Sequence, residues 1–240
     1  MKRAFLIALT SLSLFAQGPG RGGGIPDLTE PQTAALTSMT ADLASQAQAV
    51  AAARTALTTA SFADPRSDAT IRARAEAVGT AELTLATARA DAFAQLQASP
   101  AKLAPNQVAA LIAGGGGGGR GGQAGPGASG GLGSGDGRGT IPNIREPQVA
   151  ALTKLSTDVA ALAPALTDAR TALAAAAYAQ PRDDAAIRSK AEAVKAAELS
   201  IANARADAFA KIQASANELT PDQVAAFLAM GGSFVGNPFT

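Results

Sequence analysis

Apolar side chains recur at intervals of seven residues in four long segments of this chain. A spacing of seven places the members of a series on one face of an α-helix and favours a left-handed, coiled-coil-like contact between helices. Alanine fills many neighbouring positions, so the helices can approach closely while each alanine buries little area. The four series are Leu36, Leu43, Val50 and Leu57; Ile71, Val78, Leu85 and Ala92; Leu152, Val159, Leu166 and Leu173; and Ile187, Val194, Ile201 and Ala208.

These series predict pairs of long helices joined by proline-containing turns. Pro164 lies inside one of the long segments, and we expect a kink there because proline lacks an N–H and clashes with the preceding turn. The predicted long helices span residues 30–61, 67–99, 146–177 and 183–215, and short third helices begin at Pro105 and Pro221.

The two halves of the chain are copies of one another. Residues 25–113 (copy 1) align with residues 141–229 (copy 2) at an offset of 116 without a gap, and 51 of the 89 aligned positions are identical. Residues 114–139 between them contain 16 glycines among 26 residues, a composition typical of a flexible linker. The predicted organisation is a signal peptide over 1–18, a flexible spacer over 19–24, copy 1, a linker over 114–140, copy 2 and a flexible tail over 230–240.

The expected fold is all-α, with two tandem copies of a hairpin made of a long, a long and a short helix. Such a hairpin is too thin to enclose a core, so one of its faces stays apolar. The linker holds the other copy nearby at about millimolar effective concentration. We therefore expect the copies to pair as a pseudo-dimer, with pairing between chains as a homodimer left open.

A five-residue sequence motif, called the phrase below, occurs in four variants: LTEPQ at 28–32, LAPNQ at 103–107, IREPQ at 144–148 and LTPDQ at 219–223. Thr29 and Thr220 are predicted helix N-caps, and the glutamine three residues later can reach back to the cap backbone, forming a capping box. Ala104 and Arg145 lack the capping hydroxyl, which costs about 1 kcal/mol. The phrase is thus a structural motif, made by Leu28, Thr29, Gln32, Leu103, Gln107, Ile144, Gln148, Leu219, Thr220 and Gln223.

The N-terminus is typical of a secretory signal peptide. Lys2 and Arg3 precede an apolar stretch over residues 4–15, which is too short to span a bilayer, and small residues follow. Cleavage after Gly18 would leave 18 basic and 19 acidic residues, a net charge of −1. We expect a periplasmic or secreted protein without a membrane span, and this near-neutral charge does not favour nucleic acid.

The chain contains no histidine and no cysteine. Ser-His-Asp triads, Cys-His pairs and zinc sites built on histidine or cysteine are therefore excluded. We expect a protein that is not an enzyme and uses no cofactor, although carboxylates alone could still bind a hard cation.

The four phrases, two in each copy of a small helical exported chain, resemble those of the Spy/CpxP group of periplasmic proteins. The resemblance covers both copies; the phrases with Thr29 and Thr220 match fully and the other two match in part. It implies a cradle-shaped dimer of helical hairpins, here fused into one chain, that acts as an ATP-independent chaperone or envelope-stress modulator. The near-neutral charge and the missing histidine and cysteine ligands depart from that family.

The expected function is an exported ATP-independent chaperone that shields unfolded or misfolded proteins on an amphiphilic helical surface. The alternatives are an envelope sensor or regulatory adaptor, in one form metal-responsive, and a purely structural secreted coiled coil. The client-contact candidates could instead be solvated charges and core phenylalanines, with Arg72 paired to Glu76 and Arg188 paired to Glu192. These candidates, found in both copies, are Arg54, Arg66, Arg72, Arg89, Phe93, Arg170, Arg182, Arg188, Arg205 and Phe209.

Overall fold

A computed structural model describes residues 25–113 and 141–232, which include both copies. The predictions of a signal peptide, a spacer and a linker fall on residues 1–24 and 114–140, outside the described residues. Most of the predicted tail, from residue 233 onward, also lies outside them.

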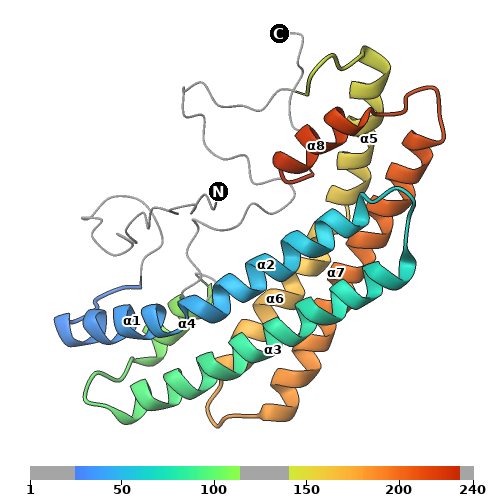
Figure 1. The fold of residues 1–240 in the computed structure, drawn as a ribbon. Coiled ribbons are helices and arrows are strands. Elements are labelled where there is room, and N and C mark those ends of the chain that lie inside the picture. The colour runs from blue at the N-terminus through green and yellow to red at the C-terminus, as the bar shows by residue number, and fades with distance from the viewer. Residues whose placement is uncertain (1–24, 114–140, 233–240) are drawn as a thin grey trace, which may run out of the picture.

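Every regular element in the described part of the chain is an α-helix, which confirms the all-α prediction (Figure 1). The short third helices begin at the two predicted prolines. Copy 1 contains α1 (Glu30–Asp42), α2 (Ala44–Ser61), α3 (Asp68–Ala98) and α4 (Pro105–Ala113), and copy 2 contains α5 (Glu146–Ala160), α6 (Ala163–Ala177), α7 (Asp184–Gln213) and α8 (Pro221–Ala229).

The first long helix of each copy, predicted as one helix with a kink at Pro164 in copy 2, is divided into two helices. In copy 2 the helix ends at Ala160 and restarts at Ala163, with Pro164 in the first turn of α6. Pro164 has no N–H to donate to the carbonyl of Ala160, and its ring crowds the preceding turn, so the interruption lies where a kink was expected. The chain changes direction there, as it does between α1 and α2 (Figure 1).

The break in copy 1 occurs at Leu43, where the sequence has no proline. The Leu43 N–H donates to the carbonyl of Met39 over 3.2 Å, and the Leu43 carbonyl accepts from the Ala47 N–H over 3.0 Å. Because both bonds keep helical spacing, this break is a bend and not a turn. It lets the Leu43 side chain lie in the same buried cluster as Leu36 and Val50.

The long second helices begin close to their predicted starts because each has a side-chain N-cap. The Ser67 hydroxyl accepts from the Thr70 N–H over 3.2 Å, and Asp183 Oδ1 accepts from the N–H groups of Ala185 and Ala186 over 2.9 Å. Such caps satisfy N–H groups that have no partner within the helix.

The two copies contact each other mainly through their second helices. Helix α3 packs along α7, and further contacts join α2 to α7, α3 to α6 and α4 to α6 (Figure 1). Small side chains form this seam: Ala86 and Ala90 of α3 are buried with the apolar residues of copy 2, and Ala202 and Ala206 of α7 are buried with those of copy 1. Alanines allow two helix backbones to come close together along their length.

The apolar series predicted from the sequence form the core. Leu36, Leu57, Val78 and Val194 are at most 4% exposed, and among the sixteen series members only Ala92 and Ala208 are not fully buried. The spacing of seven therefore selected residues that belong to the core, and the leucine and valine side chains of the series are buried within the chain.

Each copy places one aromatic side chain in the core of the other. Tyr178 of copy 2 is 1% exposed and packs edge-on against Phe93 of copy 1, with ring centroids 5.1 Å apart. At the equivalent positions, Phe62 of copy 1 packs edge-on against Phe209 of copy 2 at 5.4 Å, and also against Phe227 at 5.1 Å. Because buried aromatic rings contribute much of the energy of a contact, this exchange couples the stability of the two copies.

One described segment, Glu146–Ala177, is long and apolar enough by composition to cross a membrane. This differs from the expectation that no such segment follows the N-terminus. The segment is divided by the interruption before Pro164, and Leu152, Leu166 and Leu173 are buried in the protein core. These leucines belong to the core, whereas only 22% of the most apolar stretch of the segment is buried, and alanines such as Ala160 and Ala165 are exposed.

Burial raises the pKa of the Tyr178 phenol above its ordinary value of 10.0, and the positive charge of Arg89 opposes this only in part. The folded state therefore holds the phenolic proton more tightly than the unfolded state does. The resulting stability is fully present below pH about 10 and is lost as the pH rises through the folded pKa. We predict that the free energy of unfolding falls more steeply with pH above 10 in the wild type than in Tyr178→Phe.

Tyr178 is the only tyrosine and the chain has no tryptophan, so tyrosinate absorbance reports on this residue alone. Below pH 10 Tyr178→Phe should lie within about 1 kcal/mol of the wild type, because copy 1 has Phe62 at the equivalent position. An ionisation midpoint at or below that of free tyrosine would contradict the buried placement of Tyr178.

Candidate functional site: charged groups between the two copies

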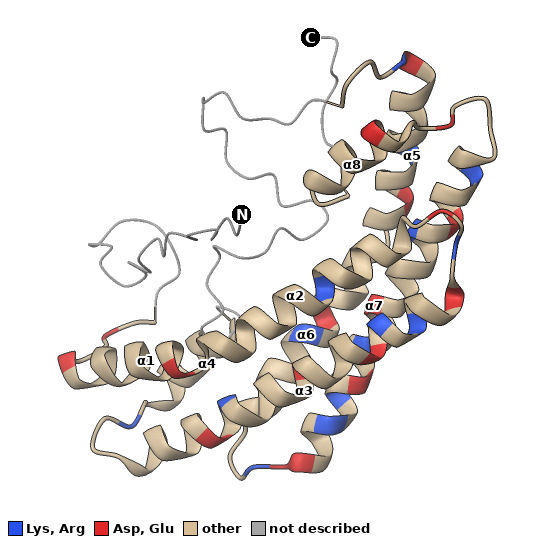
Figure 2. Ribbon diagram, viewed as in Figure 1, with Lys and Arg blue, Asp and Glu red and all other residues tan. Residues whose placement is uncertain are grey.

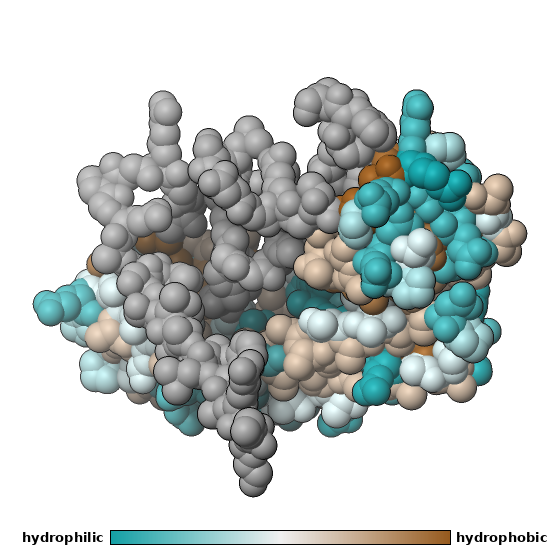
Figure 3. Space-filling model, turned by 45° about the horizontal axis from the view of Figure 1, so that its top comes forward, coloured by the Kyte–Doolittle hydropathy of each residue, from teal (hydrophilic) through white to brown (hydrophobic). Residues whose placement is uncertain are grey.

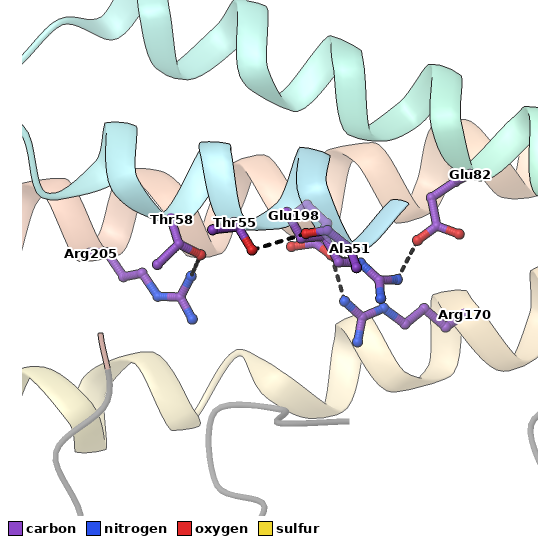
Figure 4. Close-up of polar contacts among 8 residues, drawn as sticks. Ala51, Thr55, Thr58, Glu82, Arg170, Glu198 and Arg205 are labelled. Atoms are coloured by element: carbon purple, nitrogen blue, oxygen red, sulfur yellow. Dashed lines mark hydrogen bonds and ion pairs between the residues drawn. The ribbon is translucent and has the colours of Figure 1, made fainter. Parts of the chain in front are cut away.

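Four charged side chains meet where the two copies touch, and a fifth, Arg205, lies about two turns from Glu198 along α7; we call the five together the central charge cluster. They are Arg54, Glu82, Arg170, Glu198 and Arg205 (Figure 4). Arg54 and Arg170 occupy equivalent positions in α2 and α6, and Glu82 and Glu198 occupy equivalent positions in α3 and α7. The cluster thus joins the same part of both copies.

Glu198 lies between the two equivalent arginines. Its Oε1 atom is 2.5 Å from Arg170 Nη2 and 3.2 Å from Arg54 Nε, while Arg54 Nη2 also donates to Glu82. The Arg54 Nε–H does not point at the Glu198 oxygen, so that contact is a charge attraction without a hydrogen bond. Arg54 therefore holds one carboxylate of its own copy and one of the other copy.

The carboxylates of the cluster are buried, with Glu82 4% and Glu198 6% exposed. A carboxylate is kept out of water only when charged or hydrogen-bonding partners compensate it. Removing one partner of a buried pair typically costs about 3–5 kcal/mol, because the remaining charge is left uncompensated. The cluster therefore constrains how α2, α3, α6 and α7 can pack together.

Arg205 adds positive charge to the cluster without a carboxylate of its own. Its Nη1 atom donates to Thr58 Oγ1 over 3.3 Å across the two copies. Burial lowers the pKa of Arg205, and the charge of Glu198 offsets part of that shift. The cluster thus contains three guanidinium groups and two carboxylates, which leaves an excess of positive charge in this region.

The guanidinium side of the cluster is partly open to solvent. The side chains of Arg54 and Arg170 are 31% and 22% exposed, whereas those of Glu82 and Glu198 are 6% and 8% exposed. Figure 2 shows positively and negatively charged positions gathered where α2, α3, α6 and α7 come together. Exposed Ala51 lies one turn before Arg54 on α2, so cationic and weakly apolar groups adjoin one another.

A second reciprocal set of ion pairs lies at the turns. Arg66 donates to Asp68 in its own turn over 2.6 Å and also to Asp207 of copy 2. At the equivalent positions Arg182 donates to Asp184 over 2.6 Å and to Asp91 of copy 1. These hydrogen bonds raise the pKa of both arginines, and because the aspartates are more than half exposed each pair contributes little stability.

The remaining candidates for client contact are in different environments. Arg72 and Arg188 are exposed on α3 and α7, and Arg72 Nε donates to the Asp68 carbonyl over 3.3 Å. Their predicted partners Glu76 and Glu192 instead contact a lysine of α7. Arg89 is half-buried near Tyr178.

Phe93 and Phe209 are 1% and 2% exposed and belong to the aromatic contacts between the copies. In this arrangement neither ring is at the surface. The core placement that the sequence left open for these two residues is the one observed.

The repeated phrases cap helices as predicted. In addition, the glutamine side chains of the two phrases in each copy are hydrogen-bonded to each other. Gln32 and Gln107 exchange amide hydrogen bonds of 3.2 and 3.3 Å, and Gln148 and Gln223 exchange bonds of 3.2 and 3.4 Å. Complete capping boxes form at Thr29 and Thr220. At the incomplete phrases the glutamine still accepts from the cap backbone, with Ala104 N–H and Arg145 N–H each 2.9 Å from the side-chain oxygen.

Each glutamine pair also donates hydrogen bonds to backbone carbonyls of the segment that precedes the first helix of its copy. Gln223 Nε2 donates to the carbonyls of Pro142 and Asn143 over 3.1 and 3.2 Å, and Gln148 Nε2 donates to the Glu218 carbonyl over 2.7 Å. A single side chain thereby joins the start of α5 to the start of α8. Leu219, of the same phrase, is 2% exposed and packs in the core beside these groups.

Sequence reasoning missed the two buried glutamates and the glutamine pairs. A signal was present, since Glu82 follows Val78 by four residues on α3 and Glu198 follows Val194 by four residues on α7, which places both glutamates on an apolar helix face. The glutamine pairs join residues 75 positions apart, and no local pattern reveals that contact.

Within residues 25–113 and 141–232, no group of three or more histidine, cysteine, aspartate or glutamate side chains is placed to hold a metal ion. Comparison of the chain with protein-family models, with curated proteins and with solved structures gives no match.

We predict that Gln148→Ala and Gln223→Ala each lower the free energy of unfolding by about 1–3 kcal/mol, because each leaves buried backbone groups without a partner. The two losses should not add in the double variant, since both remove the same hydrogen-bonded glutamine pair. Chemical unfolding followed by circular dichroism measures each loss.

Gln48→Ala is the matched control, because Gln48 is exposed on α2 and should change stability by less than about 0.5 kcal/mol. Fully additive losses at Gln148 and Gln223 would show that the two side chains act separately.

Proposed function

We propose that this protein is an exported ATP-independent chaperone or envelope-stress protein that binds unfolded chains loosely around the central charge cluster. We further propose that the two copies act as a fused counterpart of a dimer of helical hairpins. The resemblance of the capping phrases to the Spy/CpxP group and the signal-like N-terminus support a periplasmic setting.

The observation that carries the proposal is the partly exposed pair Arg54 and Arg170, which come from equivalent positions and share Glu198. A guanidinium group can donate to backbone carbonyls or carboxylates of an unfolded segment, and its aliphatic stem can cover apolar atoms. Neither arginine needs to leave its carboxylate fully, because each has several N–H donors.

The surface around the cluster is suited to weak contacts. Exposed positions on α2 include Ala47, Ala51 and Ala52, and much of the described surface in Figure 3 is pale or tan instead of the deep brown of strongly apolar residues. Alanine offers little area for burial, so each contact with a client contributes little. A shallow, mixed surface can hold a client briefly and release it without nucleotide hydrolysis.

A second candidate function is a purely structural secreted protein. It is favoured by the burial of the leucine and valine series in the core shared by the two copies. If the pairing of the copies is the whole purpose of the apolar faces, no client surface is required.

We predict that the purified chain, in several-fold excess and without nucleotide, slows the aggregation of an unfolding model substrate measured by light scattering. Ala51→Glu places a carboxylate one turn from Arg54 and should weaken this protection severalfold, while the protein remains folded. Raising the salt concentration should weaken it as well, because exposed charges are screened.

Ala73→Glu on α3 is the matched control, since Ala73 is also exposed but lies on a different helix from Arg54 and Arg170. It should protect as the wild type does. No protection by the wild type would reject the chaperone function and leave the structural role, and equal losses in both variants would reject this location of the surface.

A further inference from the structure

The two copies differ at a place where equivalent residues meet. Gly79 of α3 and Lys195 of α7 are equivalent at the offset of 116, and they touch across the seam between the helices. When two similar units pack with equivalent residues in contact, those residues lie on the approximate two-fold axis that relates the units. Any side chain at this position therefore faces its own counterpart.

The volume at this position is divided unequally between the copies. A Cβ atom added to Gly79 would lie 2.9 Å from Lys195 Cδ and 3.1 Å from Lys195 Cβ. The aliphatic stem of Lys195 therefore occupies the space that a side chain of residue 79 would need. A glycine inside a long helix weakens that helix relative to alanine, so its presence here has a packing reason.

The charges are divided in a matching way. Lys195 Nζ lies 3.2 Å from Glu76 Oε2 of copy 1 and 2.5 Å from Glu192 Oε2 of copy 2. Glu76 and Glu192 are themselves equivalent, so one lysine sits between two like carboxylates. Its side chain is 21% exposed, which leaves the ammonium group at the edge of the seam.

Pairing of like copies would lose both features. Two copies of copy 1 would place glycine against glycine, which leaves a gap and two glutamates with no cation between them. Two copies of copy 2 would place two lysine stems in the space that holds one, with two ammonium groups side by side. Overpacking and like charges both oppose association.

We propose that Gly79 and Lys195 form a complementary lock that makes copy 1 pair with copy 2 in preference to another copy of its own kind. The interaction surface is the α3–α7 seam, and its specific partner is the other half of the chain. This inference concerns how the halves pair and is independent of client binding, so it can fail while the chaperone proposal stands.

The direct test is a reciprocal exchange in the full chain. Gly79→Lys alone and Lys195→Gly alone should each lower the thermal midpoint by roughly 3–8 °C. The double variant Gly79→Lys/Lys195→Gly should return to within about 2 °C of the wild type. The near two-fold relation would then place the new lysine between the same two glutamates.

Thr80→Ala/Ala196→Thr is the matched control, because these equivalent residues are exposed one position further along the same helices. Its single and double variants should leave the midpoint unchanged. If the double exchange at Gly79 and Lys195 shows the sum of the two single losses, the lock is rejected.

A second test compares the pairing of two like copies with the pairing of copy 1 and copy 2. In a chain of the same design whose first half is replaced by a second copy 2, two lysines meet on the axis. Lys195→Gly in only one of those halves should raise the thermal midpoint, although the same change lowers it in the natural chain. A fall in both chains would overturn the proposal.

Discussion

The packing of α3 along α7 is the contact on which the rest of this structure depends. A hairpin of two long helices has too little volume to surround its own apolar face. Here that face is covered because each copy contributes small residues to the seam and one aromatic ring to the other copy's core, Phe62 in one direction and Tyr178 in the other. Since both copies belong to one chain, the entropy cost of bringing them together is lowered by the tether.

The charged groups at this seam determine the relative position of the two copies. They contribute less to the free energy of the contact. Burying Glu82 and Glu198 is costly, and the cost is offset only when Arg54 and Arg170 take the positions seen here. A sliding or rotated seam would leave these carboxylates without partners. The same geometry leaves part of each guanidinium group at the surface, which is the origin of the proposed client surface.

Local features of the fold could be predicted from the sequence, and contacts between distant segments could not. Thr220 and Gln223 form the expected capping box, and Val78 and Leu152 are buried as their spacing indicates. The bend at Leu43 was not predictable, because it carries no local breaker and follows from packing on other helices.

The same holds for the candidate site: its arginines could be selected from the sequence, but their contacts with distant segments could not. The arginines kept in both copies could be selected from the sequence as candidates, but the partners of Arg54 could not, because Glu82 and Glu198 lie on other helices. Phe93 looked equally suitable for a surface or a core from sequence alone, since an aromatic residue serves both. Only the position of Tyr178 against it decides for the core.

The most direct measurement of the account is a disulfide across the seam in Gly79→Cys/Lys195→Cys. The chain has no cysteine of its own. A Cβ atom on residue 79 would lie 3.1 Å from Lys195 Cβ, which is closer than the roughly 3.5–4.5 Å that a disulfide spans, so a small separation of α3 from α7 would admit the bond. Oxidation of the dilute protein should give a bond within one chain, seen as a monomer with altered mobility on a non-reducing gel and confirmed by peptide mass. Free thiols, or bonds formed only between chains, would contradict the packing of α3 on α7 within one molecule.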